Sequence, residues 1–170
     1  MAKTDAVDGT LFKFMHRYAD KPQNAPVVKA VEDYTAKGKG PFHVADVQKV
    51  AYQAAKDELI REGDKNPSTD KIQSRAFWGA AIAAEEKPFM IAEDTQALSK
   101  SVHYFTTGAI AARVASWLGF LPKPVRDFFG FHVAQGIGIL KEVADKIKGT
   151  GFNKRDIAID EAGARAALKS

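Results

Sequence analysis

Apolar side chains recur at helical spacing along almost the whole chain, and no stretch alternates apolar and polar residues as a strand does. The pattern predicts an all-α fold, a single-domain bundle of about six to seven helices over residues 1–170. The expected helices are about Leu11–Ala19, Pro26–Ala36, Val44–Glu62, a helix ending before Pro88, Thr95–Leu118, Pro124–Lys148 and Asn153–Leu168. Because Gly149-Thr-Gly151 stops one helix and turns the chain, we expect a C-terminal helical hairpin.

Small residues line one face of each of two late helices. Gly130, Ala134 and Gly138 recur every four positions, and Gly108 and Ala112 begin a similar row. Such rows predict close approach of helix backbones, which also holds nearby side chains in fixed positions.

Three uncharged stretches lie in the second half of the chain, at residues 101–112, 114–122 and 128–140. Each is shorter than the roughly 18–20 apolar residues that a membrane span requires, so we interpret them as buried helices of a soluble bundle. The alternative is a helical hairpin that enters a bilayer, because two of the stretches flank Pro122-Lys123-Pro124.

The chain has 25 basic and 21 acidic side chains, a net charge of +4, and no Cys. The missing Cys excludes disulfides, thiol nucleophiles and Cys-ligated zinc. Residues 101–170 hold ten of the bases and six of the acids, an excess that suits anionic material. The bases are scattered among acids without a recognised motif, so we expect no nucleic-acid partner.

Four acids near the end of the chain share helix faces. Glu142 and Asp145 lie three positions apart, and Asp156 and Asp160 lie four apart. In an antiparallel hairpin, facing residues have a constant sum of indices, which places Glu142 opposite Asp160 and Asp145 opposite Asp156. Converging carboxylates need a compensating cation.

The candidate compensators are Lys141, Arg155, His103 and a divalent metal. All-oxygen ligation favours Mg, Ca or Mn, and a histidine admits Zn. Two plainer interpretations stay open for the acids. Asp156 with Asn153 forms a capping-box pattern, and Asp145 with a nearby lysine forms a surface ion pair of little energetic value.

His103 shares its helix face with Thr107, four residues on. The two are either an acid/base with an orienting partner or a buried pair that satisfies itself. His132, between aromatic residues, is expected in the core or at a helix contact, whereas His16 and His43 are expected on the surface.

Residues from about 99 to 164 resemble the YfiM family of predicted bacterial envelope lipoproteins. The matching segments are Ser99-Lys100-Ser-Val-His103, Lys141-Glu142-x-x-Asp145, Gly149-Thr-Gly151-Phe and Asp156-Ile-Ala-x-Asp160-x-x-Gly163. Ser99 stands where the family pattern has an acid, and Asn153 stands where it has a Ser. The resemblance singles out His103, Lys141, Glu142, Asp145, Asp156 and Asp160 together, and leaves about residues 1–98 as N-terminal helices without a recognised relative.

These observations favour a hydrolase that acts on a bacterial envelope component, peptidoglycan or lipid. His103, Glu142, Asp145 and Asp160 are its expected catalytic residues, with Lys141, Asp156 and Thr107 in support and a divalent metal as a candidate cofactor. The alternative is a non-enzymatic helical toxin or interaction module that binds a membrane or a protein.

The first nine residues do not have the pattern of an export signal, because acids stand where a basic and then an apolar region is needed. We therefore expect the bacterial cytoplasm, or the envelope or secretion by a leaderless route or after leader removal. The expected partners are an envelope polymer or lipid, with peripheral membrane contact.

Overall fold

The computed structural model describes residues 22–92, 99–147 and 154–169, except the side chains of residues 99, 100, 144 and 145. After a short 3-10 turn at Pro22–Asn24, this part of the chain forms six α-helices and confirms the predicted all-α bundle. The helices are α2 (Ala25–Thr35), α3 (Val44–Arg61), α4 (Thr69–Glu86), α5 (Ser99–Trp117), α6 (Lys123–Ile147) and α7 (Lys154–Leu168). The predicted helix Leu11–Ala19 lies outside the described residues, as do residues 95–98 of the predicted helix Thr95–Leu118.

Local sequence signals explain several helix ends. Helix α2 is followed by the segment Lys37-Gly-Lys-Gly-Pro41. In this segment Gly40 has a φ of +60°, which residues with a side chain rarely adopt. Helix α4 begins after Ser68, whose hydroxyl accepts a hydrogen bond from the Lys71 backbone N–H. It ends at Glu86, just before Pro88, as the sequence predicts.

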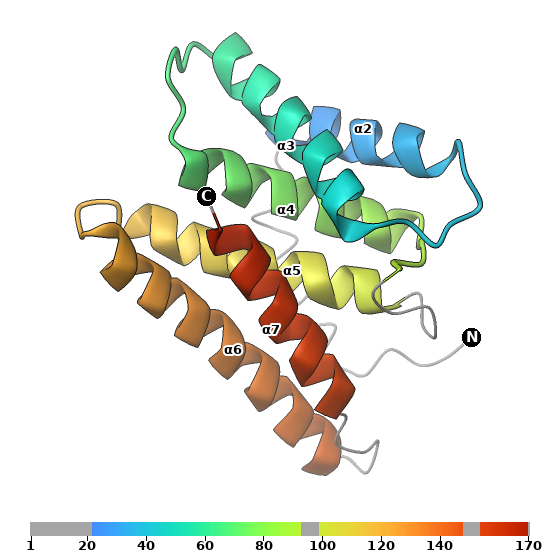
Figure 1. Ribbon diagram of the computed structural model, residues 1–170, viewed down its shortest axis with the longest axis vertical. Helices are drawn as coiled ribbons and strands as arrows, with labels where there is room; N and C mark the ends of the chain where they lie inside the picture. The colour runs from blue at the N-terminus through green and yellow to red at the C-terminus, as the bar shows by residue number, and fades with distance from the viewer. Residues whose placement is uncertain (1–21, 93–98, 148–153, 170) are drawn as a thin grey trace.

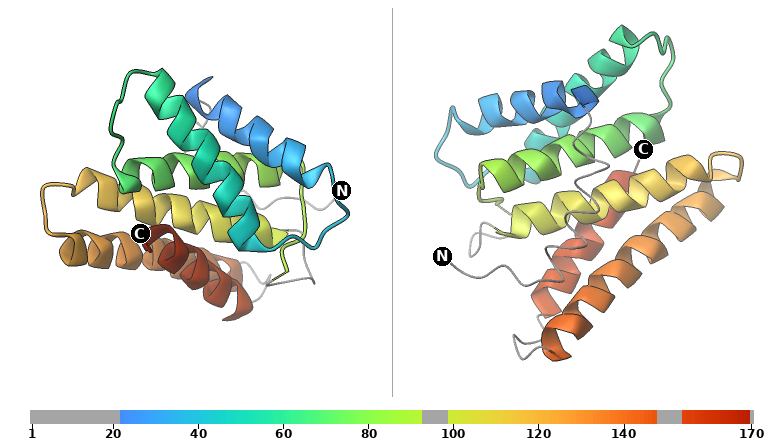
Figure 2. Two further views of the ribbon diagram at one scale, coloured as in Figure 1. Left: turned by 45° about the horizontal axis from the view of Figure 1, so that its top comes forward. Right: turned by 180° about the vertical axis from the view of Figure 1, so that it is seen from behind.

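Helices α4 and α5 lie side by side at the centre of the molecule (Figure 1). Helices α2 and α3 pack on α4 from one side, and α6 and α7 pack on α5 from the other (Figure 2). Helix α6 is therefore an edge helix, which packs on α5 and α7. The C-terminal hairpin of α6 and α7 closes over α5, and this places three helices around one polar cluster.

Aromatic rings fill the contact between the two central helices. Phe77 of α4 stacks with Tyr104 of α5 at a centroid distance of 6.3 Å, and Phe105 is completely buried beside them. The crossing of α5 and α7 is tight because a Cβ on Gly163 would lie 2.1 Å from the Tyr104 carbonyl oxygen. The row on α6 is equally close, since a Cβ on Gly130 would lie 2.6 Å from the Ala111 carbonyl oxygen.

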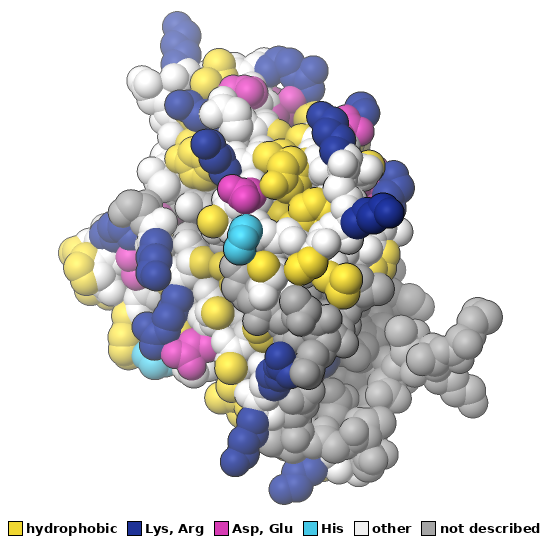
Figure 3. Space-filling model, turned by 45° about the vertical axis from the view of Figure 1, so that its right-hand side comes forward, with side chains coloured by type: hydrophobic (Ala, Val, Ile, Leu, Met, Phe, Trp, Pro, Cys, Tyr) yellow, Lys and Arg dark blue, Asp and Glu magenta, His cyan; other side chains and the backbone are white. Residues whose placement is uncertain are grey.

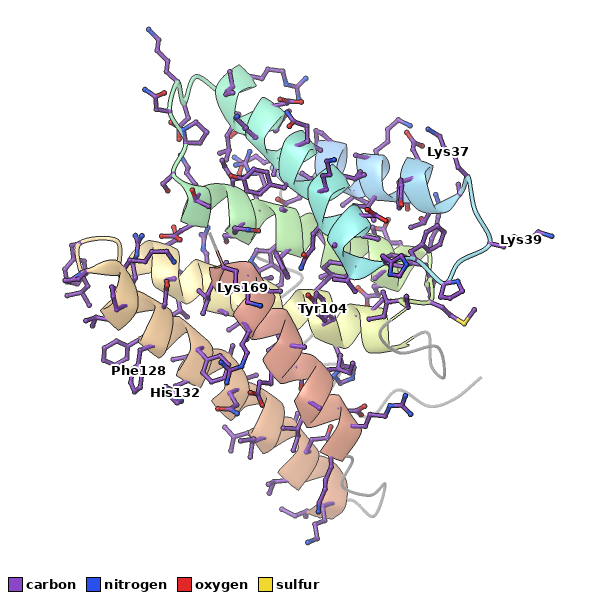
Figure 4. All side chains as sticks on the ribbon, viewed as in Figure 1. Lys37, Lys39, Tyr104, Phe128, His132 and Lys169 are labelled. Carbon is purple, nitrogen blue, oxygen red and sulfur yellow. The ribbon has the colours of Figure 1, made fainter. Side chains whose placement is uncertain are left out.

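The apolar stretch of α6 departs from the prediction. Residues 128–140 are only partly a core segment, because Phe128, Phe129 and Leu140 are exposed at 58%, 46% and 69%. Phe128 and His132 project from α6 away from α5 and α7 (Figure 4). The expectation of a core His132 is also wrong: its ring is exposed and lies 4.2 Å from the Phe128 ring. Small residues took the inward face of α6, so its large residues point outward.

Among the described residues, no helix is both long enough and apolar enough to cross a membrane.

Candidate functional site

The polar cluster lies where α5, α6 and α7 meet. Helix α5 contributes His103 and Thr107, α6 contributes Lys141 and Glu142, and α7 contributes Asp160. His103 and Thr107 occupy successive turns of one helix face, as their spacing predicts. The five side chains come from positions up to 57 residues apart, so only the folded chain assembles them.

Asp160 is the buried end of the cluster, with a side chain only 4% exposed. Its Oδ1 lies 3.2 Å from His103 Nδ1 and 2.9 Å from the Thr107 hydroxyl. The same hydroxyl lies 2.9 Å from the His103 carbonyl oxygen, so its single proton is divided between two acceptors. A buried carboxylate is costly unless hydrogen bonds satisfy it, and α5 supplies two of them to one oxygen.

Lys141 approaches the other ring nitrogen of His103, with its Nζ 3.4 Å from Nε2. An ammonium group only donates hydrogen bonds, so this contact is a hydrogen bond when Nε2 carries a lone pair. The imidazole is then the neutral tautomer whose Nδ1–H donates to Asp160. The geometry therefore defines an ordered chain from Thr107 through Asp160 and His103 to Lys141.

Burial decreases along this chain of hydrogen bonds. The side chains of His103 and Lys141 are 17% and 20% exposed, whereas that of Asp160 is nearly closed off. Water therefore reaches the Lys141 end and is kept from the Asp160 end. The His103 ring thus has a buried carboxylate at Nδ1 and the partly exposed Lys141 ammonium group at Nε2.

Glu142 is the most buried acid of the described residues, at 1% exposure. Its Oε1 lies 3.8 Å from the ammonium nitrogen of the neighbouring Lys141. Lys141 thus stands between a buried carboxylate and the His103 ring. A cation in this position offsets the burial of Glu142 and lowers the repulsion expected of converging acids.

Gly138 makes room for the Asp160 carboxylate. A Cβ on Gly138 would lie 2.7 Å from Asp160 Oδ2, closer than real Cβ atoms come to a neighbour. Gly138 therefore lies against the Asp160 carboxylate, one helical turn before Glu142, the residue that the index sum places opposite Asp160. Asp160 forms hydrogen bonds with α5, which crosses α7, whereas the α6–α7 hairpin opens away from its turn (Figure 1).

Other predicted site residues have different outcomes. The side chain of Asp145 lies outside the described residues, as does the proposed cap residue Asn153. Asp156 is half-buried in the first turn of α7, where the helix dipole stabilises a carboxylate. The structure joins His103, Thr107, Lys141, Glu142 and Asp160 in one cluster.

The described residues can be compared with the expected divalent-metal site. No three His, Asp or Glu side chains in them come together as a group able to hold a metal ion. The described ligands therefore give no support to the divalent cofactor that the acid pattern had suggested. The Lys141 ammonium group provides a positive charge beside one of these acids, 3.8 Å from Glu142 Oε1.

Sequence reasoning missed one member of the site. Gly138 was recognised as part of a packing row, but its place beside Asp160 was not predicted. The available signal was its spacing: Gly138 lies four residues before Glu142, so the two share the inward face of α6.

Charge outside the cluster is mixed. Lys and Arg side chains are spread over the surface between acidic and hydrophobic ones, without one continuous basic patch on the face seen in Figure 3. Comparisons with protein-family models, curated proteins and solved structures found no match to this chain.

Proposed function

We propose that the protein is a hydrolase of a bacterial envelope component, peptidoglycan or lipid, with His103 as its acid/base. The observation that carries this proposal is the graded chain of contacts, closed at Asp160 and open at His103 and Lys141. Asp160 holds the ring in the tautomer whose Nε2 accepts a proton. Thr107 holds Asp160 in turn.

The chemistry follows from these positions. A water molecule replaces Lys141 Nζ at His103 Nε2 and gives up a proton to this nitrogen, and the resulting hydroxide attacks the electrophilic centre of the substrate. His103 then returns the proton to the leaving group. Lys141 stabilises the negative charge that develops on the substrate, because its ammonium group lies beside the nitrogen that exchanges the proton.

A glycosidase mechanism, in which the hydrolase cleaves the sugar chains of peptidoglycan, receives less support. Retaining and inverting glycosidases need two carboxyl groups that flank the scissile bond. Asp160 instead gives one oxygen to both His103 and Thr107, and Glu142 lies closed off beside Lys141. We therefore assign the acid/base role to His103 and treat Glu142 as a positioning residue for Lys141.

The test is turnover by the purified full-length chain. Peptidoglycan sacculi and phospholipid vesicles are incubated separately, and released muropeptides and fatty acids are measured. His103→Gln is expected to lower the rate at least about 100-fold, the usual contribution of a general acid/base. His43→Gln is the matched control, because His43 is an exposed histidine at the start of α3. Equal rates in His103→Gln and the parent chain overturn the proposal, as does the absence of products from both substrates.

A second candidate function is a non-enzymatic helical module whose polar cluster specifies packing. The observation that favours it is the contact of Lys141 with Nε2, which leaves both ring nitrogens of His103 with partners inside the protein. Under this proposal His103→Gln changes the free energy of unfolding without changing any turnover. Measuring both quantities on the same preparation separates the two functions.

A further inference from the structure

Helix α6 carries large apolar side chains on the side that faces solvent. We call this surface the α6 apolar face, and it consists of Val125, Phe128, Phe129, Val133, Ile139, Leu140, Val143 and Ile147. Each of these side chains is at least 40% exposed, and Ile147 reaches 82%. The solvent side of a helix in a bundle is ordinarily polar, and contiguous exposed apolar surface marks an interaction site.

The arrangement of these residues is periodic. At 100° per residue they occupy an arc of about 140° along the full length of α6. Gly136, His132 and Lys146 are the other residues in this arc. The opposite arc holds the buried small residues Gly130, Ala134 and Gly138, which pack on α5 and α7. The apolar face is thus set by the same packing that buries the small-residue row.

Two further exposed aromatic side chains lie just before the start of α6 in the chain. Trp117 at the end of α5 and Phe120 in the following turn are 62% and 80% exposed. The guanidinium group of Arg113 lies 5.4 Å from the Trp117 ring centroid. Exposed Trp beside a cation is typical of side chains that sit at the boundary between lipid and water.

The charge along the face has one sign in the described residues. Lys146 is exposed within the arc, and Arg113 lies at its Trp117 end. Of the α6 acids with described side chains, Asp127 is half-buried and ion-paired with Lys123, and Glu142 is buried. An apolar ridge edged by cations complements a surface of acyl chains beneath anionic headgroups.

The size of the face favours a lipid surface over a second copy of the chain. A 25-residue helix is about 37 Å long, and an exposed strip about 10 Å wide along it covers on the order of 370 Å². A stable protein interface buries about 800 Å² on each partner. A single convex ridge falls short of that area, whereas an amphipathic helix of this length lies in a membrane interface through its apolar side alone.

We infer that the α6 apolar face docks on the surface of an anionic phospholipid bilayer, with the axis of α6 parallel to the membrane plane. The apolar side chains enter the boundary between headgroups and acyl chains, and Lys146 and Arg113 contact the anionic headgroups. This inference stands on the face alone and goes beyond the proposed hydrolase, because docking requires no turnover at His103.

The test is flotation of the full-length chain with vesicles of phosphatidylglycerol and phosphatidylcholine in equal parts. We expect the protein to float with these vesicles, and to bind pure phosphatidylcholine vesicles at least about fivefold more weakly. The double substitution Leu140→Asn with Ile147→Asn is expected to lower vesicle binding at least tenfold. Both sites lose the favourable free energy of moving an apolar side chain from water into lipid. Ile60→Asn is the matched control, since Ile60 is an exposed apolar residue of α3 outside the face.

A second measurement places the face at the lipid boundary. The chain has two Trp residues, and Trp78 is half-buried in α4. In a Trp78→Phe background, Trp117 fluorescence is expected to shift to shorter wavelength when the mixed vesicles are added. His103→Gln is expected to leave flotation unchanged, so failure of the hydrolase and failure of docking are separately visible.

Three outcomes overturn the inference. One is absence of flotation with the mixed vesicles, and another is equal binding by the parent chain and the Leu140/Ile147 variant. The third is a concentration-dependent dimer, seen by sedimentation, that the double substitution dissociates while vesicles bind nothing. In that case the occupant of the face is a second copy of this chain.

Discussion

Gly138 and Asp160 fit together so closely that a single methyl group on the glycine would lie 2.7 Å from the carboxylate oxygen Oδ2. Helix α6 therefore limits where the Asp160 carboxylate can lie. The position of His103 depends on the same glycine, because Asp160 Oδ1 is the partner of its Nδ1.

Gly138→Ala is expected to displace the Asp160 carboxylate and loosen its contact with His103. The net loss of stability is about 1–2 kcal/mol, since overpacking outweighs the gain of up to about 1 kcal/mol in helix propensity. The specific readout is the ¹⁵N chemical shift of the His103 ring, which reports its tautomer. An unchanged ring signal in the folded variant contradicts the proposed coupling.

Asp160→Asn tests the same His103 tautomer by changing the hydrogen-bond partner of Nδ1. The amide keeps the shape of the carboxylate but loses its charge, so the preference for a proton on His103 Nδ1 is expected to weaken. In the parent chain, long-range ¹H–¹⁵N spectra near pH 8 should show one dominant tautomer, with Nδ1 protonated. The Asn variant should show a mixture or the other tautomer. A parent spectrum dominated by protonated Nε2 disproves the described hydrogen bond.

Gly163→Ala is expected to destabilise the protein by about 3 kcal/mol. The new methyl would meet the backbone carbonyl of Tyr104, which cannot move unless α5 and α7 separate. Gly136→Ala is the matched control, because nothing lies within 4 Å of its Cβ position. It should stabilise α6 by about 0.5–1 kcal/mol through helix propensity. Urea unfolding of both variants checks the pair, and equal effects argue against the tight crossing.

Asp70 and Arg126 connect α4 to α6, with the Arg126 Nη1 2.7 Å from the Asp70 Oδ2. The Asp70 side chain is 7% exposed, so removing it leaves a largely buried guanidinium without this carboxylate. Asp70→Ala is expected to cost about 2 kcal/mol of stability. Asp57→Asn, at an exposed position of α3, should change the unfolding free energy by less than about 0.5 kcal/mol. A similar small change in Asp70→Ala shows that the pair contributes little.

Acid sensitivity is predicted for the link between α3 and α4. The side-chain hydrogen bond from Lys71 holds the pKa of Asp64 below its ordinary value. A lowered folded pKa gives stability that is present above the unfolded value of about 3.9 and is lost as the pH falls through the folded pKa. The unfolding midpoints of the parent chain and Asp64→Asn should therefore converge as the pH falls from 6 toward 3.

Lys71→Gln removes the same pair and should reproduce the pH profile of Asp64→Asn. Both effects are small because the Lys71 and Asp64 side chains are 50% and 29% exposed, so solvent screens the ion pair. A difference between parent and Asp64→Asn that grows toward low pH contradicts the assigned cause of the pKa shift.

Much of the fold is predictable because helix boundaries are local. The Ser68 cap, the break at Gly40 and the stop before Pro88 act within a few residues, and the structure has helix ends at each of them. The inward row of Gly130, Ala134 and Gly138 was also predictable, since Gly and Ala recurring every four residues permit close backbones. In the site, the contact of His103 and Thr107 with one another follows from helical spacing.

Features that depend on three-dimensional packing were harder to predict. The index sum treats α6 and α7 as parallel rods, but the two helices open away from their turn (Figure 1), and the contact of Asp160 with Gly138 was not predicted. Hydrophobicity alone also predicted a buried Phe128. The inward face of α6 was already filled by small residues, so the side chains of Phe128 and Leu140 had no core to enter.

The long separation of His103 from Asp160 has a consequence for synthesis of the chain. At 5–20 residues per second, the ribosome adds the 57 intervening positions in about 3–11 seconds. During that interval α5 can pack on α4, while the carboxylate that fixes the imidazole does not yet exist. Any chemistry at His103 is therefore acquired last, as the closing helix emerges, and a nascent or interrupted chain carries the histidine without its orientation.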